Sequence, residues 1–307
     1  MARILVTGGA GFIGSNLVDT YLALGHDVAV VDNFWAGKRE NLNPKARFYE
    51  VDVRTPALAE VFEKEKPEVV NHLAAQIDVR KSLDEPIFDA EVNILGGINL
   101  LELCVKHKVA KFIFASTGGV IYGEPKELPA TENCPPSPKC HYAASKLAFE
   151  FYLKLYYNLY GMRYTILRYP NVYGPRQSPS GEAGVCSILT GIMLAGKTPT
   201  LYGFGKAERD YVFVGDVARA NVMALEKGDG EIVNLGWGHG VAVREVFDAL
   251  AEIIGFKEEP NLAPLRPGEI ERCFISGAKA TAVLGWKPET TLREGLAQVV
   301  AHIRAHS

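Results

Sequence analysis

The stretch Thr7-Gly8-Gly9-Ala10-Gly11-Phe12-Ile13-Gly14-Ser15 decides the fold. It follows an apolar run, Ile4 to Thr7, that is typical of a strand, and it opens a run, Phe12 to Leu24, with the pattern of a helix. Glycines at such a turn let backbone N–H groups approach a pyrophosphate at the helix N-terminus, where the helix dipole favours negative charge. A glycine pattern alone is weak evidence, but its place between a strand and a helix predicts a dinucleotide-binding turn.

Acidic residues at the ends of the next two predicted strands support this interpretation. Asp32 ends the second predicted strand, eighteen residues after Gly14. Its carboxylate can accept hydrogen bonds from the adenosine ribose, and its charge would repel a 2′-phosphate. The sequence therefore favours NAD over NADP, and the alternative is a polar residue that merely ends a strand. Asp52 and Val53 follow the third predicted strand, where they either reach the adenine or simply end that strand.

Strand-like and helix-like runs alternate over the first 170 residues, which predicts an α/β fold with a doubly wound parallel sheet (Rossmann). We expect strands at Ile4–Thr7, Val28–Asp32, Phe48–Val51, Val69–Leu73, Lys111–Ser116 and Tyr164–Arg168, and helices at Phe12–Leu24, Pro56–Lys64, Asp89–His107 and Tyr142–Tyr160. Residues 1–170 would form the NAD-binding domain, and residues 171–307 a smaller C-terminal α/β substrate domain. The buried-looking run 231–235 is expected to return to the large sheet.

The composition argues against several classes of protein. Among 307 residues, 33 Lys and Arg nearly balance 36 Asp and Glu, and no basic block points to nucleic acid or an anionic membrane. A small molecule is the expected partner. The N-terminus runs directly into a strand and no apolar run reaches membrane-spanning length, so we expect a cytoplasmic protein. The five cysteines contain no C-x-x-C pair and the seven histidines are scattered, which indicates neither a disulfide framework nor a metal site.

A second motif, Tyr142-Ala143-Ala144-Ser145-Lys146, lies within a predicted helix. Residues four apart lie on one face of a helix, so the Tyr142 phenol and the Lys146 ammonium would be neighbours. A positive charge nearby stabilises a phenolate and lowers the phenol pKa from its ordinary value of about 10. The pair is therefore a candidate for proton transfer. Such pairs also occur by chance, so the rest of the chain must supply a partner for it.

That partner is expected at the carboxyl ends of the strands, where ligands of parallel sheets bind. The fourth predicted strand leads into Leu73-Ala74-Ala75-Gln76, whose small residues permit close approach of the backbone to a cofactor. The fifth leads into Thr117-Gly118-Gly119. On this topology the Thr117 hydroxyl can share a hydrogen bond with a substrate hydroxyl that Tyr142 deprotonates, while Lys146 holds the cofactor ribose. A lone threonine at a strand end is usually structural, but the combination favours catalysis.

These motifs resemble the extended short-chain dehydrogenase/reductase family, and within it the UDP-glucose (UDP-galactose) 4-epimerases. The resemblance covers essentially the whole chain and rests on Thr7-Gly8-x-x-Gly11-x-x-Gly14, Asp32-Asn33, His72-Leu73-Ala74-Ala75, Ser82-x-x-x-Pro86, Asn93, Ser116-Thr117, Tyr142-x-x-x-Lys146, Arg168-Tyr169-Pro170-Asn171, Arg209-Asp210-Tyr211-Val212 and Arg266-Pro267-Gly268-Glu269.

The resemblance implies that NAD takes part in inverting C4 of a UDP-hexose through a transient 4-keto sugar. It carries Thr117, Tyr142 and Lys146 over as catalytic residues that touch substrate or cofactor. The motifs above and the resemblance together give the full set of predicted cofactor-binding residues: Gly8, Gly11, Phe12, Ile13, Gly14, Asp32, Asn33, Asp52, Val53, Leu73, Ala74, Ala75, Gln76, Asn93, Tyr142 and Lys146.

The resemblance also bears on the substrate and on assembly. Asn171, Arg209 and Arg266 match positions that hold the diphosphate of a sugar nucleotide, a task that suits the planar guanidinium. Family members commonly pair through two long helices, which here match 89–107 and 142–160, so a homodimer is expected.

Three departures bear on the reaction. Gly118 and Gly119 stand where related dehydratases place an acidic pair, so dehydration lacks its acid and base. Cys140-His141 precede Tyr142 where many relatives have Ser-Pro; the two interpretations are a different loop conformation and His141 as an extra acid. Cys273 aligns near a position that limits the sugar C2 substituent. Its small side chain suggests tolerance of N-acetylated UDP-sugars, against the alternative of an ordinary half-buried cysteine.

Other functions remain open on the sequence alone. One is a different NAD-dependent sugar-nucleotide enzyme, such as a UDP-N-acetylglucosamine or UDP-glucuronate 4-epimerase or a decarboxylase. Another is a noncatalytic NAD-binding protein on the same fold, since fold does not fix function. The intact set Thr117, Tyr142 and Lys146 argues against the noncatalytic alternative.

Overall fold

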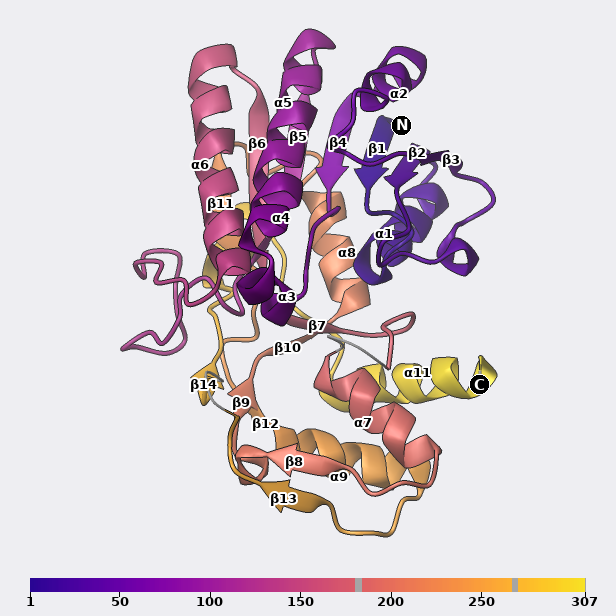
Figure 1. The fold of residues 1–307 in the computed structure, drawn as a ribbon, viewed down its shortest axis with the longest axis vertical. Coiled ribbons are helices and arrows are strands. Elements are labelled where there is room, and N and C mark those ends of the chain that lie inside the picture. The colour runs from indigo at the N-terminus through magenta and orange to yellow at the C-terminus, as the bar shows by residue number, and fades with distance from the viewer. Residues whose placement is uncertain (180–183, 267–269, 307) are drawn as a thin grey trace.

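A parallel sheet of seven strands, in the order β11-β6-β5-β4-β1-β2-β3, organises the computed structural model (Figure 1). The model describes residues 1–179, 184–266 and 270–306. The strands of the sheet are β1 (Arg3–Thr7), β2 (Asp27–Asp32), β3 (Arg47–Glu50), β4 (Val69–His72), β5 (Lys111–Thr117), β6 (Arg163–Tyr169) and β11 (Glu231–Asn234). The predicted doubly wound sheet is confirmed, and the six strands expected before residue 170 agree with the observed ones to within one residue at each end.

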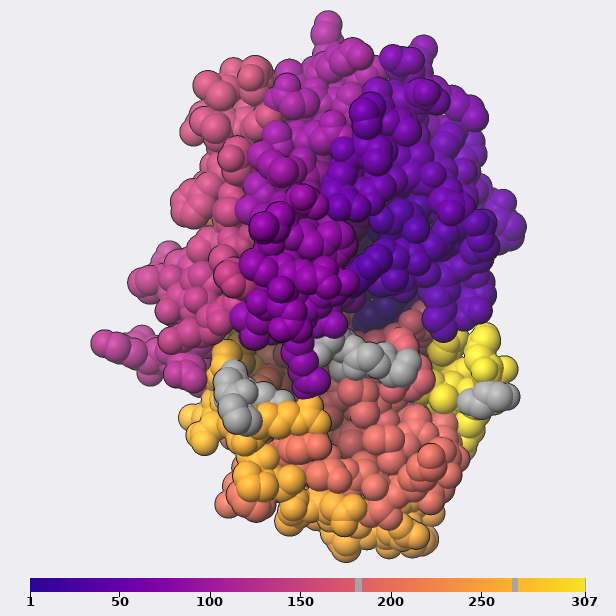
Figure 2. Space-filling view, viewed as in Figure 1, coloured from indigo at the N-terminus to yellow at the C-terminus, as the bar shows by residue number. Residues whose placement is uncertain are grey.

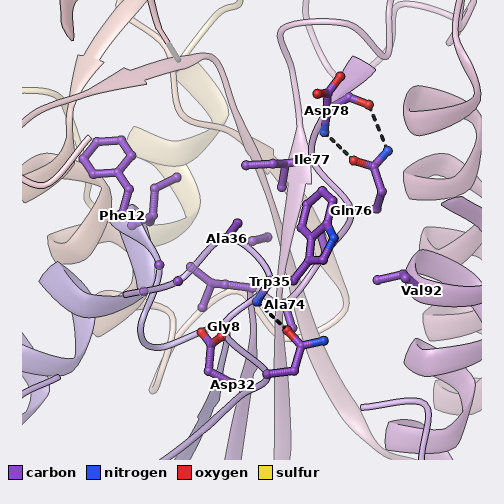
Figure 3. Close-up of a pocket in the computed structure, with 18 of the residues that line it drawn as sticks. Gly8, Phe12, Asp32, Trp35, Ala36, Ala74, Gln76, Ile77, Asp78 and Val92 are labelled. Atoms are coloured by element: carbon purple, nitrogen blue, oxygen red, sulfur yellow. Dashed lines mark hydrogen bonds between the residues drawn. The ribbon is translucent and has the colours of Figure 1, made fainter. Parts of the chain in front are cut away.

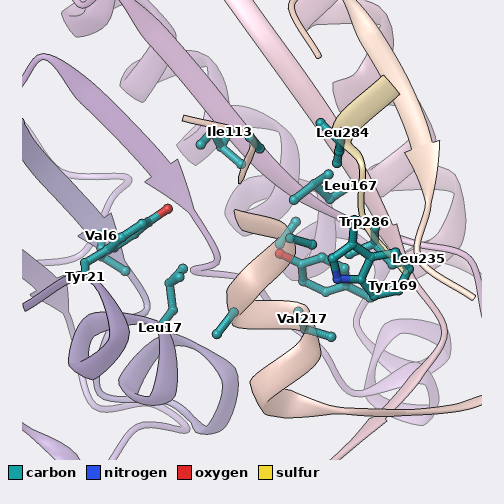
Figure 4. Packing of buried hydrophobic residues seen from close by; sticks show 14 of the residues in the cluster. Val6, Leu17, Tyr21, Ile113, Leu167, Tyr169, Val217, Leu235, Leu284 and Trp286 are labelled. Atoms are coloured by element: carbon teal, nitrogen blue, oxygen red, sulfur yellow. The ribbon is translucent and has the colours of Figure 1, made fainter. Parts of the chain in front are cut away.

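Each face of the sheet carries its own hydrophobic core, because successive side chains of a strand point to opposite sides. Ile4 and Val6 of β1 pack toward one face, and Leu5 packs toward the other. Figure 4 shows the first core, in which Leu17 and Tyr21 of one helix and Val217 of another meet the sheet. The helices on this face are α1 (Phe12–Ala23), α8 (Val214–Met223) and α10 (Ala278–Leu284), and those on the opposite face are α2 (Leu58–Glu65), α5 (Gly96–Lys106) and α6 (His141–Tyr160).

The helix expected over 89–107 differs from the observed one. The helical run begins earlier, with α3 (Val79–Asp84) and α4 (Pro86–Ala90), and a π-helical turn (η2, Glu91–Leu95) separates α4 from α5. Proline at its first turn suits the start of α4. Within α5, a Cβ on Gly97 would lie 2.4 Å from the Phe149 ring, so the absent side chain lets α5 approach α6 closely.

The lower part of the molecule is built around a third core (Figures 1 and 2). Its helices are α7 (Val185–Leu194), α9 (Val243–Ile254) and α11 (Leu292–Ala305), and its strands are β7 (Asn171–Tyr173), β8 (Thr200–Tyr202), β9 (Glu208–Arg209), β10 (Tyr211–Phe213), β12 (Val241–Ala242), β13 (Asn261–Ala263) and β14 (Arg272–Cys273). Short 3₁₀ helices occur at Arg39–Asn41 and Gly203–Gly205. Among the described residues, no helix is both long and apolar enough to cross a bilayer.

The chain crosses between the two parts more than once. It leaves the sheet after β6 and returns as β11, which pairs in parallel with β6 from Glu231 opposite Thr165 to Asn234 opposite Arg168. Helices α8 and α10 also pack on the sheet, although both follow residue 170. The C-terminal half of the sequence therefore completes the large sheet and also forms the lower part.

A buried ion pair fixes α6 to the centre of the sheet. Arg168 of β6 donates to both carboxylate oxygens of Glu150 on α6, with Nη2–Oε2 at 2.6 Å and Nε–Oε1 at 2.9 Å. Ser116 of β5 donates its hydroxyl to the same Oε1 at 2.6 Å. All three side chains are buried. Because Glu150 lies four and eight residues after Lys146 and Tyr142, it shares their helix face and sets where they meet the strand ends.

We expect Glu150→Ala to lower the free energy of unfolding by about 3–5 kcal/mol, because it leaves the Arg168 guanidinium buried without its counter-charge. Urea unfolding of the purified protein measures this. Glu252→Ala is the matched control, since it breaks an exposed pair with Arg293 and should cost less than about 1 kcal/mol. Equal losses in the two variants would show that the buried pair does not hold α6 in place.

Candidate active site

The turn between β1 and α1 is as close-packed as its glycines predict. A Cβ on Gly14 would lie 2.1 Å from the Gly8 carbonyl oxygen, and a Cβ on Gly8, whose φ is +73°, would lie 2.7 Å from the Ala74 nitrogen. No side chain caps the start of α1 at Gly11. The first-turn N–H groups of α1 are therefore available to an anionic ligand, and a dinucleotide pyrophosphate fits this cradle.

A cavity of about 870 Å³ opens beside this turn, where the strand order reverses between β1 and β4 (Figure 3). Ligands of doubly wound sheets bind at this place. Most of the predicted cofactor and catalytic residues line it: Gly8, Gly11, Phe12, Ile13, Gly14, Asp32, Asn33, Asp52, Val53, Leu73, Ala74, Ala75, Gln76, Thr117, Tyr142 and Lys146. The structure thus brings together residues that lie more than 130 positions apart in the sequence.

Asp32 is held rigidly at the cavity wall. Its Oδ2 accepts from the Ala10 N–H at 3.0 Å and its Oδ1 from the Phe34 N–H at 2.8 Å, and the side chain is buried. Burial raises the pKa of Asp32, and the backbone donors oppose that rise. Each carboxylate oxygen keeps a lone pair for a ribose hydroxyl. This carboxylate therefore fits the adenosine ribose of NAD.

Asp52 is fixed by a different set of partners. Arg54 binds its two oxygens at 2.8 and 3.0 Å, and the Asn33 amide donates to Oδ2 at 2.9 Å. Hydrogen bonds from the Arg54 guanidinium are the main reason that the pKa of Asp52 falls to about 2. Asp52 is therefore an anion at neutral pH, and its place beside Val53 in the cavity lining is compatible with the predicted adenine contact.

Asn93 is the one predicted cofactor residue that lies behind the cavity wall. Its amide exchanges hydrogen bonds with the Gln76 backbone, accepting from N–H at 2.9 Å and donating to the carbonyl at 3.1 Å. It also donates to Asp89 Oδ1 and Ser145 Oγ, both at 3.1 Å. Asn93 lies in the π-helical turn between α4 and α5. Its side chain contacts the loop after β4 on one side and Ser145 of α6 on the other. It joins the loop after β4 to α6.

The predicted catalytic residues converge at the floor of the cavity. Thr117 ends β5, and Tyr142 and Lys146 lie one turn apart on α6, with all three lining the cavity. The Lys146 ammonium donates to the Ala115 carbonyl at 2.9 Å and lies 4.7 Å from the centre of the Phe114 ring. It lies 5.9 Å from the centre of the Tyr142 ring. The three side chains are therefore anchored on two neighbouring elements.

The pKa of Tyr142 corrects one sequence-based prediction. The pKa of the phenol is raised, chiefly because burial disfavours the phenolate, with Cys140 and Asp89 adding to the rise. The Lys146 ammonium donates to the Ala115 carbonyl and lies 5.9 Å from the centre of the Tyr142 ring. Burial lowers the pKa of Lys146 to about 8, so most of its positive charge persists at neutral pH. A further positive charge near the phenol would favour the phenolate.

The residues before Tyr142 form the start of α6. The helix begins at His141, one residue earlier than expected, with Cys140 in extended conformation at its N-cap. The His141 side chain is exposed and is not among the residues that line the cavity. The extended Cys140 at the N-cap fits the interpretation as a different loop conformation, and the cavity lining among the described residues does not include His141.

Two predicted substrate residues, Thr117 and Tyr142, line this cavity. The other four, Asn171, Arg209, Arg266 and Cys273, are not among the lining residues and lie in the lower part of the molecule. Asn171 begins β7, and its Oδ1 lies 3.6 Å from where a Cβ on Gly119 would be. Arg209 donates to the backbone carbonyls of Glu208, Ile270 and Glu271.

The other two predicted substrate residues also contact neighbouring groups. The Arg266 guanidinium lies 3.7 Å from the centre of the Tyr202 ring. The Cys273 thiol is buried and donates to the Gly119 carbonyl at 3.1 Å. Residues 267–269 of the Arg266 motif lie outside the described residues.

Sequence reasoning missed several residues of the cavity wall. Trp35, Lys81 and Phe88 line one side, and Arg176 and Gln177 line another. Arg176 pairs with Asp19 at 2.6 Å and has a positive φ of +71°. Trp35 sits two residues from a motif that was recognised, but no periodic pattern or charge signal marked it. The other four enter the wall only through the tertiary fold.

Comparison with known proteins points to one family. Residues 4–236 match the model of the NAD dependent epimerase/dehydratase family. The chain is 43% identical to a UDP-glucose 4-epimerase from Mycolicibacterium smegmatis over 99% of both chains. It is 48% identical to a Thermotoga maritima UDP-glucose 4-epimerase structure with UDP-glucose, with a TM-score of 0.97 and 99% of each chain covered. A Thermus thermophilus UDP-glucose 4-epimerase structure with NAD matches at 48% identity and a TM-score of 0.93, covering 99% of this chain and all of the other.

Proposed function

Since the chain belongs to the NAD dependent epimerase/dehydratase family, within the extended short-chain dehydrogenase/reductases that its motifs predicted, we propose that it is a UDP-glucose 4-epimerase. It inverts C4 of a UDP-hexose, interconverting UDP-glucose and UDP-galactose with NAD as its cofactor. The observation that carries the proposal is the convergence of Thr117, Tyr142 and Lys146 on one cavity with the glycine turn and Asp32.

Three side chains have separate roles in the proton transfer. Tyr142 takes the proton of the sugar 4-hydroxyl and later returns it, while the Thr117 hydroxyl shares a hydrogen bond with the reacting oxygen. Lys146 holds the cofactor ribose and keeps positive charge near the phenol. Bound NAD⁺ would supply the hydride acceptor for C4 and positive charge near the Tyr142 phenol. The site would have to hold the 4-keto sugar in two orientations for C4 to be inverted.

The absence of acidic residues after Thr117 favours epimerisation over dehydration. Gly118 and Gly119 occupy that position, and the Gly119 carbonyl is taken by the Cys273 thiol. Elimination of water needs one group to protonate the leaving hydroxyl and another to remove a proton. Neither glycine supplies one, so the site supports reversible oxidation without loss of water.

The two halves of the sequence take different parts of the reaction in this proposal. Residues 1–170 bind NAD, and residues 171–307 bind the nucleotide sugar. The exceptions are β11, α8 and α10, which follow residue 170 but belong to the large sheet and its first core. Asn171, Arg209 and Arg266 hold the diphosphate. Support comes from their common place in the lower part and from the chemistry of the guanidinium group, which can bind phosphate oxygens bidentately.

N-acetylated UDP-sugars are a second class of substrate that one observation favours. Cys273 lies beside the backbone that follows Thr117, with its thiol 3.1 Å from the Gly119 carbonyl oxygen. A Cβ on Gly119 would lie 3.6 Å or more from its nearest neighbours. Two small residues next to the catalytic strand end leave room for a larger sugar substituent.

We further propose a homodimer that pairs through α5 and α6. Exposed large apolar side chains gather on α6, where Phe151, Leu155 and Leu159 are 61%, 46% and 61% exposed at a spacing of four residues. That spacing forms one stripe along the helix, and stripes of this kind mark interaction surfaces. Leu95, 59% exposed, lies in the π-helical turn that precedes the neighbouring helix α5.

A cytoplasmic location completes the proposal. All five cysteines are unpaired, and Cys104, Cys186 and Cys273 are buried thiols. Free thiols are usual in a reducing compartment. Fractionation of cells that express the chain checks the location.

We expect Tyr142→Phe to lower turnover by about 10²–10⁴-fold, because the base and acid of the reaction is removed. Native protein and variant are each incubated with a panel of UDP-sugars without added NAD, and the products are identified by NMR. The variant should retain as much bound NAD as the native protein. Tyr160→Phe, an exposed tyrosine at the end of the same helix, is the control and should keep full turnover. Recovery of only unchanged sugars from the native protein would reject the epimerase proposal.

Cys273→Tyr tests the substituent pocket. We expect the native protein to epimerise both UDP-glucose and UDP-N-acetylglucosamine, and the variant to lose about tenfold or more on the N-acetylated sugar, because a phenol fills the space beside Gly119. Retained turnover of UDP-glucose shows that the variant is folded. If neither protein acts on UDP-N-acetylglucosamine, the wider substrate range is wrong.

Leu155→Asp places a charge in the apolar stripe of α6 and is expected to convert the dimer to a monomer. Analytical ultracentrifugation of the native protein and the variant measures the change. Leu262→Asp is the matched control, because Leu262 is 54% exposed but lies in β13 of the lower part. A native protein that sediments as a monomer, or an α6 variant that remains dimeric, contradicts pairing through this helix.

A further inference from the structure

Three side chains bridge the mouth of the cofactor cavity. Trp35 follows β2 and is 45% exposed, and its ring lies 6.1 Å from that of Phe88 on α4, with the two planes tilted by 52°. The Lys81 ammonium of α3 lies 5.2 Å from the centre of the Trp35 ring and 5.0 Å from that of Phe88. All three residues line the cavity. We call this group the Trp35–Lys81–Phe88 bridge.

The bridge connects two walls that are built independently. Trp35 belongs to the wall that carries Asp32, and the backbone N–H of Trp35 donates to Asn33 Oδ1 at 3.0 Å. Figure 3 shows the indole directed away from Asp32 and toward the side of the cavity that bears Gln76 and Val92.

Lys81 and Phe88 belong to the other wall, which follows β4. Asp78 caps α3 by accepting from the Lys81 N–H at 2.8 Å, and Glu85 pairs with the Lys81 ammonium at 3.5 Å. Arg54, whose guanidinium lies 5.3 Å from the centre of the Phe88 ring, packs on the same wall. Each side of the bridge is therefore anchored on its own wall, and among the described residues Trp35 meets its two partners through side-chain contacts.

The chemistry of the bridge suits a closure that can open. Aromatic pairs and cation–π contacts at exposed sites are individually weak, so a bridge of three such contacts can break and re-form. The indole and phenyl rings both line the cavity and lie 6.1 Å apart. A dinucleotide bound beneath them would have to separate the rings in order to leave.

Retention of the cofactor matters for a reaction in which the sugar transfers a hydride to the cofactor and later takes it back. The cofactor molecule that accepts the hydride must also return it, because loss of the reduced form would strand a 4-keto sugar. We propose that Trp35, Lys81 and Phe88 form a strap that closes over bound NAD and slows both its escape and its entry. The proposal rests on the proposed function only for the need to retain NAD; the strap itself is a property of cofactor exchange.

The test measures NAD exchange in the holoenzyme without any sugar. Protein loaded with radiolabelled NAD⁺ is chased with unlabelled NAD⁺ to give the dissociation rate, and equilibrium titration gives Kd. We expect Trp35→Ala and Phe88→Ala each to speed dissociation by about tenfold while Kd changes by less than about threefold, because a strap slows entry and exit alike. The double variant should be no faster than the faster single variant, since either change opens the strap.

Two controls separate the strap from other effects. Leu83→Ala removes an exposed apolar side chain of α3 that is not among the cavity-lining residues, and it should exchange NAD⁺ at the native rate. Trp35→Phe keeps an aromatic ring and should recover most of the retention. Unchanged melting temperatures show that the variants are folded.

Three results would overturn the proposal. They are native dissociation rates in both single variants, multiplied effects in the double variant, and a Kd that rises in step with the dissociation rate, which would indicate an ordinary contact to the cofactor. Failure of the proposed function gives a different result. If the protein epimerises no UDP-sugar but Trp35→Ala still speeds NAD⁺ dissociation, the epimerase proposal is wrong and the strap proposal stands.

Discussion

The ion pair between Glu150 and Arg168 is the constraint on which the site depends. It joins α6 to β6, and through Ser116 to β5, so the helix that carries Tyr142 and Lys146 has one position relative to the strand that ends at Thr117. A buried charge pair adds little net stability, but separating its partners is costly, because either charge alone would be unpaired in the interior. The pair therefore holds Tyr142 and Lys146 of α6 in place relative to Thr117 of β5.

The same burial that orders the site also sets its electrostatics. Desolvation raises the pKa of the Tyr142 phenol and lowers that of the Lys146 ammonium to about 8, so burial shifts both groups toward their neutral forms, although Lys146 stays mostly charged at neutral pH. Positive charge close to the phenol, such as the nicotinamide of bound NAD⁺ would bring, favours the phenolate.

The fold and the cofactor half of the site were predictable because they depend on local patterns. Strand ends, glycine spacing and residues four apart on a helix are properties of short segments, and they located Gly14, Asp32 and the Tyr142–Lys146 pair. The pKa of Tyr142 was not predictable, since it depends on burial by the whole fold. The bridge formed by Trp35 and Phe88 likewise joins the loop after β2 to helix α4, and these two segments come close only after the sheet has formed. Asn93 was predicted to bind the cofactor from the family resemblance; it lies in a π-helical turn, bonded to the Gln76 backbone and outside the cavity lining.

The return of the chain to the sheet as β11 has a consequence for how the molecule can be divided. β11 covers one side of β6, whose residues Ile166 and Leu167 are fully buried. A fragment that stopped at residue 170 would leave β6 as a bare edge strand, with a row of unpaired backbone groups beside an apolar surface. Such edges recruit strands from other molecules. The nucleotide-binding half is therefore not a detachable module, and its protection against aggregation is encoded in β11, which begins 85 residues after Lys146, its last catalytic side chain.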